Sequence, residues 1–233
     1  MVSATTRRAL LSDWAVRSMR EDVGSDVPDA AELVRLWQVT QPGLAVDGDP
    51  GPRTMRALWL RHRPSAVDVV GRASAAVAWP RVSYRLGKGG FDWMRDAGAA
   101  LALCDCSGFV AHCLGIPRGS ADEAVGGPAW IETSQLVHDA RGPQTLVRAL
   151  RLAEAAPGDL VVHGDPPGGG QGHVGIVVTH AVLSPKGLPQ FLTVDCGGPR
   201  RVSAIAEQDR SARWLSKGAI IARPVWYGQE RIA

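Results

Sequence analysis

Two kinds of hydrophobic pattern follow one another along the chain, and their order limits the folds that it can adopt. Apolar residues recur at helical spacing in residues 10–19 and 33–37. From Asp159 onward the pattern changes to short β-type runs separated by tight Gly/Pro turns, at 160–162, 173–178, 191–196 and 219–226. Helices first and antiparallel strands afterwards predict an α+β fold. The segment HRPSA at 62–66 separates two differently built parts, which predicts a small helical domain over 1–63 and a larger domain over 66–233.

Capping and breaking residues place the predicted helices. Asp29 can cap a helix that contains Leu33, with Glu32 as its capping-box partner, and Pro52 suits the first turn of a third helix. An Ala-rich helix is expected over 66–79. A buried helix is expected over 109–114, beginning near Cys106.

Composition excludes several classes of protein. The chain has 233 residues, of which 45% are hydrophobic and 21% charged, so it is not disordered. No apolar run approaches the roughly 18 residues that cross a bilayer, and the first residues lack the apolar stretch of a signal peptide. The net charge is +3, and the basic residues, almost all arginine, are scattered. Neither a membrane nor a nucleic acid is therefore an expected partner.

The Gly/Pro-rich segment at 37–58 fits neither a calcium loop nor a phosphate loop. The positions of an EF-hand that need a fifth ligand and a bidentate Glu hold Gly51 and Leu58, and no Gly-Lys-Ser/Thr follows. On spacing alone it is a helix–turn–helix linker whose glycines supply positive φ.

The same segment resembles the repeat of the small three-helix peptidoglycan-binding domains. The matching residues are Trp37, Gln38, Gly43, Leu44, Val46, Asp47, Gly48, Gly51, Pro52, Thr54, Ala57 and Leu58. The resemblance implies that Trp37, Gln38, Asp47, Gly48 and Thr54 belong to a cell-wall-binding module, which would raise the effective concentration of an attached domain at the wall.

Three of the four cysteines lie within ten residues: Cys104, Cys106 and Cys113, with Cys196 further on. A structural zinc site favours two to four residues between paired cysteines, whereas one residue separates the first pair here. As a nucleophile, Cys106 would sit at a helix N-terminus, where unpaired N–H groups favour the thiolate and can stabilise an oxyanion.

A cysteine nucleophile requires a base and a group that orients the base. His173 opens the most apolar run, HVGIVV, and shares one strand face with Gly175, whose missing side chain would let the Cys106 helix approach. Asp195 ends the next strand and can lie beside His173 in an antiparallel hairpin. Alternatively, Asp195 caps a turn before Gly197.

These residues resemble the NlpC-type papain-like cysteine peptidases of bacterial cell walls. The matching segments are 83–87 (SYRLG), 105–110 (DCSGFV), 158–161 (GDLV) and 172–177 (GHVGIV). The resemblance covers residues 67–226 and implies a papain-like fold with Cys106 and His173 as catalytic residues. It also implies that Tyr84 lies near the oxyanion and that no cofactor is needed. The family commonly has His, Asn or Gln where this chain has Asp195. The segment around Trp130 matches no motif.

Together these features predict a peptidoglycan hydrolase that cleaves an amide bond of the peptide stem. An endopeptidase is favoured over an N-acetylmuramoyl-L-alanine amidase, and a phage-type lysin fits the absence of a signal peptide. The alternatives are an inactive wall-binding adaptor and a zinc-site protein. The expected partners are the stem peptide and glycan of peptidoglycan, and a monomer is expected. The site of action would be the cell wall, while the route of export is left open.

Overall fold

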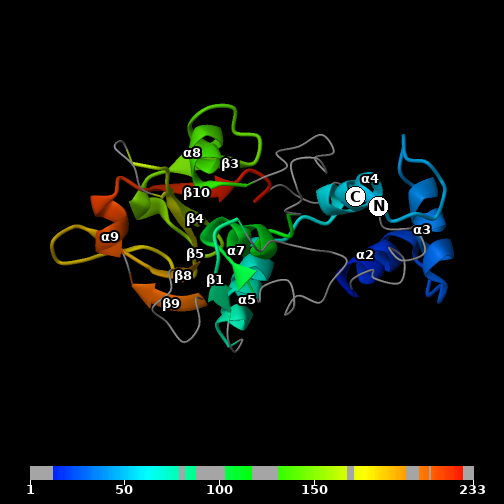
Figure 1. Ribbon diagram of the computed structural model, residues 1–233, viewed down its shortest axis with the longest axis horizontal. Coiled ribbons are helices and arrows are strands. Elements are labelled where there is room, and N and C mark those ends of the chain that lie inside the picture. Colours follow the sequence, from blue (N-terminus) through cyan, green and yellow to red (C-terminus); the bar gives the residue numbers. More distant parts are fainter. Residues whose placement is uncertain are drawn as a thin grey trace.

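Figure 1 shows the protein as a computed structural model, which describes residues 13–78, 82–87, 103–116, 131–166, 171–197, 205–209 and 211–227. The expectations that concern residues 10–11, Trp79, Trp130 and Gly198 lie outside these ranges. Within the ranges, no helix combines the length and the apolar character needed to cross a bilayer.

Three short helices at the start of the chain pack around a small core of their own. They are α2 (Asp13–Val23), α3 (Ala30–Val39) and α4 (Pro52–Arg61). The core consists of Ala15, Met19, Leu33, Val34, Trp37 and Leu58. The predicted helix starts are confirmed, because Asp29 accepts a hydrogen bond from the Glu32 N–H at 2.8 Å and Pro52 is the first residue of α4. The Glu32 carboxylate binds Arg35 at 3.3 Å instead of completing the predicted capping box.

One buried carboxylate joins all three helices. Asp22 of α2 accepts hydrogen bonds from Trp37 Nε1 of α3 at 2.7 Å and from Arg61 Nε of α4 at 2.8 Å, and its Oδ2 lies 2.9 Å from His62 Nε2. Burial alone would raise the pKa of Asp22, but these three partners outweigh it and hold that pKa below its ordinary value.

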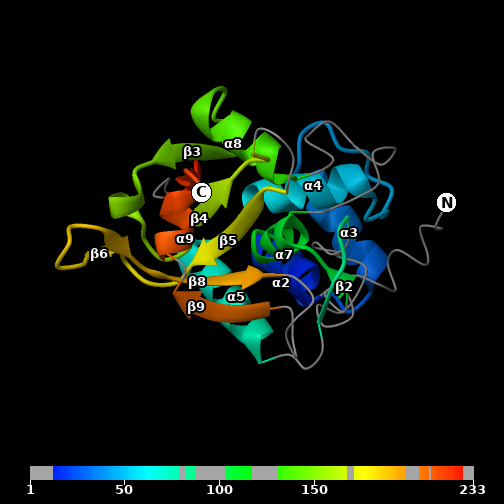
Figure 2. The same cartoon turned by 60° about the vertical axis from the view of Figure 1, so that its left-hand side comes forward.

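The described residues from Ala66 onward include three further helices that pack on one side of a six-stranded sheet. The helices on one side are α5 (Ala66–Val77), α7 (Cys106–Cys113) and α8 (Thr133–Arg141). Every pair of neighbouring strands is antiparallel, in the order β3 (Val147–Leu150), β10 (Ile220–Pro224), β4 (Leu160–His163), β5 (His173–Val177), β8 (Leu192–Cys196) and β9 (Ile205–Asp209). Figure 2 shows β5, β8 and β9 side by side.

Four shorter strands and two short helices complete the described structure. They are β1 (Ser83–Tyr84), β2 (Leu103–Cys104), β6 (Val182–Leu183), β7 (Pro189–Gln190), the 3₁₀ helix η2 (Leu152–Glu154) and α9 (Ser211–Ser216). The parallel pair β1–β2 lies directly before α7, and the hairpin β6–β7 extends the connection between β5 and β8.

Alternating residues of the strands build a different core on each face of the sheet. Val174 and Ile176 of β5 join the core that includes α5 and α7, whereas Val177 joins a second core with Trp214 of α9. Figure 1 accordingly shows α9 on one side of the sheet and α5 and α7 on the other. His173 and Gly175 share the parity of Val177 and therefore face α9.

The sequence Gly158-Asp159 fixes the sheet to α5 and to β10. Gly158 has φ +91°, and an added Cβ would lie 2.8 Å from Cα and Cβ of Ala66. Asp159 is buried and accepts two hydrogen bonds from Arg223, at 2.7 and 2.8 Å. This motif, which the sequence analysis matched to a peptidase family, therefore has a packing function here.

The predicted α+β architecture is confirmed, and so are the four predicted strands, as β4, β5, β8 and β10. The elements that were not predicted are α8, α9, β3, β9 and the short strands.

Candidate active site

Asp105 sets the start of the helix that carries Cys106. Its Oδ1 accepts a hydrogen bond from the Gly108 N–H at 2.7 Å, which caps α7, as the sequence led us to expect for a helix beginning near Cys106. Every residue of α7 is buried, so the helix runs through the core rather than along the surface. Cys106 thus lies at the N-terminal end of a buried helix.

The second carboxylate oxygen of Asp105 holds the segment that carries Tyr84. It accepts a hydrogen bond from the Gly87 N–H at 2.6 Å, and β1 pairs with β2 so that Tyr84 lies opposite Cys104. Burial, followed by the negative charge that the nearby Cys106 carries when it is ionised, raises the pKa of the Tyr84 hydroxyl. Tyr84 therefore lies near Cys106 and keeps its proton at neutral pH.

The Cys106 thiol lies against the first residues of β5. Its sulfur accepts hydrogen bonds from the backbone N–H groups of Ser107 and Val174, and only 5% of the residue is exposed. Burial and then the charge of Asp105 raise the pKa of this thiol to about 12, although both N–H groups act to lower it. The helix N-terminus acts in the predicted direction, but burial outweighs it, so the isolated thiol is protonated at neutral pH.

His173 and Asp195 meet across β5 and β8, as the hairpin geometry predicted. Asp195 lies opposite Gly175 in the pairing, and its Oδ2 is 3.1 Å from His173 Nε2. Asp195 is fully buried, whereas 17% of the His173 side chain is exposed. Asp195 therefore lies within a strand and bonds the imidazole, rather than capping a turn.

Two contacts of this pair were not foreseen. The Trp214 ring stacks on the His173 ring, with centroids 5.3 Å apart and planes at 10°. Gln208 Nε2 donates a hydrogen bond to Asp195 Oδ1 at 2.6 Å. Both come from elements, α9 and β9, that no motif marked.

The prediction that Gly175 lets the Cys106 helix approach β5 is wrong, because the glycine faces the other side of the sheet. The helix that carries Cys106 packs on the opposite face of β5, the face of Val174 and Ile176. An added Cβ on Gly175 would instead lie 3.1 Å from the Asp195 Cβ and 3.6 Å from the Trp214 ring. Gly175 therefore makes room for the groups that hold His173, not for α7.

Cys106 and His173 are both held at the beginning of β5. The thiol bonds the N–H of Val174, the residue that follows His173. No hydrogen bond joins the sulfur to the imidazole in the described structure, and the ring's Nδ1 has no hydrogen-bond partner among the described residues. Because Nε2 is bonded to Asp195, Nδ1 is the ring nitrogen that has no hydrogen-bond partner among the described residues.

The residues before β5 are fixed by α8. An added Cβ on Gly172 would overlap the Thr133 side chain, and the Gly172 N–H donates to Asp165 Oδ1 at 2.6 Å. Ser134 of α8 also bonds Asp165, at 3.2 Å. The helix α8, which follows the segment around Trp130 that matched no motif, therefore packs against the residue directly before His173.

The other cysteines are packing residues. Cys104, Cys113 and Cys196 are buried and free, and Cys104 hydrogen-bonds Cys196. Among the described residues, no group of three or more His, Cys, Asp or Glu side chains is arranged to hold a metal ion.

In the N-terminal helices, the motif residues build the loop rather than a binding surface. Gln38 is 2% exposed; its Nε2 donates to Asp47 Oδ1 and Thr54 Oγ1, and its Oε1 accepts from the Gly48 N–H. Trp37 is fully buried, and Thr54 and Gly48 are also buried. Of the five residues that the resemblance assigned to a cell-wall-binding module, Asp47 alone is exposed. The buried positions of the other four give them a structural role in this module.

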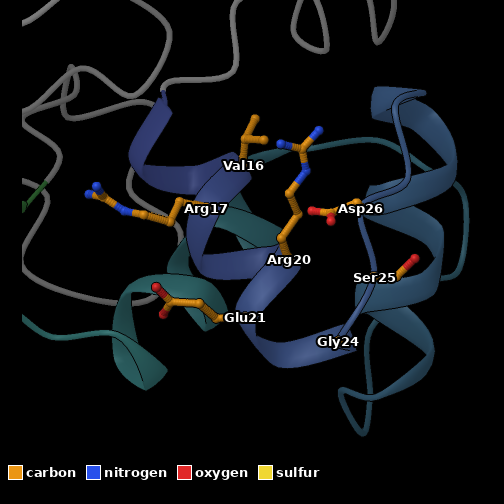
Figure 3. A pocket seen from close by; sticks show the side chains of 7 residues that line it. All are labelled: Val16, Arg17, Arg20, Glu21, Gly24, Ser25 and Asp26. Atoms are coloured by element: carbon orange, nitrogen blue, oxygen red, sulfur yellow. The ribbon is translucent and has the colours of Figure 1, made fainter.

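A shallow cavity of about 620 Å³ lies beside α2 (Figure 3). Its lining residues are Val16, Arg17, Arg20, Glu21, Gly24, Ser25 and Asp26. Two guanidinium and two carboxylate groups line it, so it offers charged contacts to a polar ligand. None of the residues that the sequence analysis marked lines this cavity.

No family model, curated protein or solved structure matches this chain.

Proposed function

We propose that the protein is a papain-like, NlpC-type peptidoglycan hydrolase with two domains, residues 1–63 for wall binding and residues 66–233 for catalysis. The observation that carries the proposal is the meeting of three features at the start of β5. The thiol of Cys106 lies at a capped helix N-terminus and bonds the Val174 N–H, and the adjacent His173 is bonded to Asp195.

The proposed reaction is acyl transfer by the Cys106 thiol. Because the pKa of the thiol is raised to about 12, the sulfur becomes nucleophilic as its proton passes to His173 Nδ1. The sulfur then attacks the carbonyl carbon of an amide in the stem peptide. Asp195 accepts a hydrogen bond from Nε2 and so stabilises the imidazolium.

The oxyanion and the leaving group are served by neighbouring groups. The Cys106 N–H at the start of α7 and the Tyr84 hydroxyl, which keeps its proton, are the donors for the oxyanion. Collapse of the tetrahedral intermediate breaks the C–N bond, and the imidazolium gives its proton to the departing amine. Water then hydrolyses the thioester by the reverse proton transfers, which regenerates the thiol.

Digestion of purified sacculi, with mass spectrometry of the released muropeptides, tests the proposal and identifies the bond. Cys106→Ala and His173→Ala should each lower product formation by at least about 10³-fold while leaving co-sedimentation with sacculi unchanged. His180→Ala, at an exposed histidine three residues beyond β5, is the matched control and should remain active. Lysis by Cys106→Ala in the presence of a chelator would exclude the mechanism.

One observation favours a second candidate, an inactive wall-binding adaptor. Cys106 is 5% exposed, and its thiol is held protonated by burial. An adaptor would bind sacculi without releasing muropeptides, whereas the proposed hydrolase would release them.

A further inference from the structure

Both oxygens of the Asp195 carboxylate are engaged, each by a different strand. Oδ2 lies 3.1 Å from His173 Nε2 on β5, and Oδ1 accepts a hydrogen bond from Gln208 Nε2 on β9 at 2.6 Å. Gln208 pairs with Thr193, so it is a diagonal neighbour of Asp195 on the same face of the sheet. The edge strand β9 thus reaches the imidazole through Asp195.

The Gln208 bond fixes the plane of the carboxylate. A carboxylate held by one donor can rotate about its Cβ–Cγ bond, whereas donors at both oxygens define one orientation. Because the Gln208 amide donates to Oδ1, that oxygen acts as an acceptor and Oδ2 is directed at His173. Asp195 is fully buried, so solvent does not replace the Gln208 donor.

This orientation selects the tautomer of His173. An acceptor at Oδ2 requires a proton on Nε2, so the neutral ring has its lone pair on Nδ1, the nitrogen without a hydrogen-bond partner in the described structure. The Trp214 ring, stacked at 5.3 Å, limits rotation of the imidazole from its other side.

We propose that Gln208 is a positioning residue for the Cys106–His173 pair, acting through Asp195 to keep Nδ1 of His173 as the basic nitrogen. The proposal rests on the proposed function for its catalytic meaning, but the state of the imidazole can be measured without any activity.

The first test is the tautomer of His173 in the full-length protein, read from long-range ¹H–¹⁵N NMR spectra of histidine-labelled samples at high pH. The wild-type ring should be almost entirely the Nε2–H form. Gln208→Met, which keeps the volume but removes the donor, should bring the Nδ1–H form to a substantial fraction. Glu207→Met, on the same strand but exposed, is the matched control and should leave the tautomer unchanged.

The second test is a pH profile of muropeptide release by Gln208→Glu. A protonated Glu at this position donates to Asp195 as the amide does, so activity should survive at low pH and fall as that proton is lost. Among the described residues, His163 on β4 lies opposite His173, and the charges of Arg213 and Lys217 act on His163; all three are retained in the variant. The wild-type protein should not show this additional loss of activity with rising pH.

The outcomes separate this inference from the proposed function. In Gln208→Met, kcat should fall about tenfold with KM nearly unchanged. A wild-type tautomer in Gln208→Met overturns the positioning role, whatever the activity. If the tautomer shifts in Gln208→Met while the wild-type protein releases no muropeptides, the positioning of His173 stands and the proposed hydrolase function fails.

Discussion

At the scale of single residues, the candidate nucleophile is governed by competition between burial and hydrogen bonding. Two backbone N–H groups stabilise the Cys106 thiolate, yet burial and the Asp105 charge raise its pKa to about 12. A thiolate formed in advance would need the opposite balance. In the proposed function, the Cys106 thiol therefore depends on proton transfer to His173, so the position of His173 is decisive.

Asp105 carries the first residue-scale prediction. Asp105→Asn keeps an oxygen that can cap α7, replaces the oxygen that accepts from the Gly87 N–H with an NH₂ group, and removes the charge that disfavours the thiolate. The pKa of Cys106 should fall, and its alkylation by iodoacetamide at pH 9, followed by mass spectrometry, should be about threefold to tenfold faster.

Asp29→Asn is the control for this change, because it alters a helix cap in the same way on α3. It should leave the alkylation rate of Cys106 as in the wild type. An unchanged or slower rate in Asp105→Asn would mean that burial alone keeps the thiol protonated.

The sequence indicated some of the site residues and missed others for a physical reason. Cys106, His173 and Asp195 could be proposed because a helix start and a strand pair place them by local geometry. Gln208 and Trp214 could not be proposed, because β9 and α9 lie near His173 only as a result of the order of the strands in the folded sheet. The sequence analysis correctly expected the missing side chain of Gly175 to make room for a neighbour. It could not identify that neighbour, because the sequence does not show which face of β5 each helix covers.

At the scale of elements, the helices and strands with a clear apolar pattern could be predicted from the sequence, and those without one could not. The strands β4, β5 and β8 consist largely of apolar residues because both of their faces are covered. The edge strand β9 (IAEQD) and the helix α8 carry many polar residues, and their burial depends on the neighbours that they pack against. Such elements have no signal of their own in the sequence.

Gly158 carries the prediction at this scale, since it connects η2 to β4 and contacts α5. Gly158→Ala combines an unfavourable φ of +91° with a Cβ 2.8 Å from Ala66. The free energy of unfolding should fall by about 2–4 kcal/mol, measured by chemical denaturation.

Gly187→Ala separates the two causes of this loss. Gly187 has φ +72°, but no atom lies within 4 Å of an added Cβ, so this variant tests backbone strain alone. Its loss should be about 1–2 kcal/mol. Equal losses in the two variants would show that the contact with Ala66 adds nothing.

At the scale of the whole molecule, the chain has separate hydrophobic cores for the N-terminal helices and for the sheet. The N-terminal core is small, so polar links between its helices contribute a large share of its stability. In the proposed function this unit holds the catalytic part at the wall, and its motif residues serve that role by forming the loop around Gln38.

Asp22 provides the last prediction, because it bonds Trp37, Arg61 and His62 from within the N-terminal helices. Asp22→Ala leaves these groups without their shared acceptor, and the stability of the helical unit should fall by about 2–4 kcal/mol near neutral pH. The pKa of Asp22 is lowered in the folded protein, so its contribution is present above the ordinary carboxyl pKa and is lost as the pH falls below about 4. Denaturation curves at pH 6 and pH 3 should therefore show a large difference in stability between wild type and variant at pH 6 and a smaller one at pH 3.

Alkylation of Cys106 at pH 9 is the control and should be equally fast in both proteins, because this thiol belongs to the core of the sheet and not to that of the N-terminal helices. A stability difference that does not shrink at pH 3 would show that the carboxylate's charge is not what joins the helices.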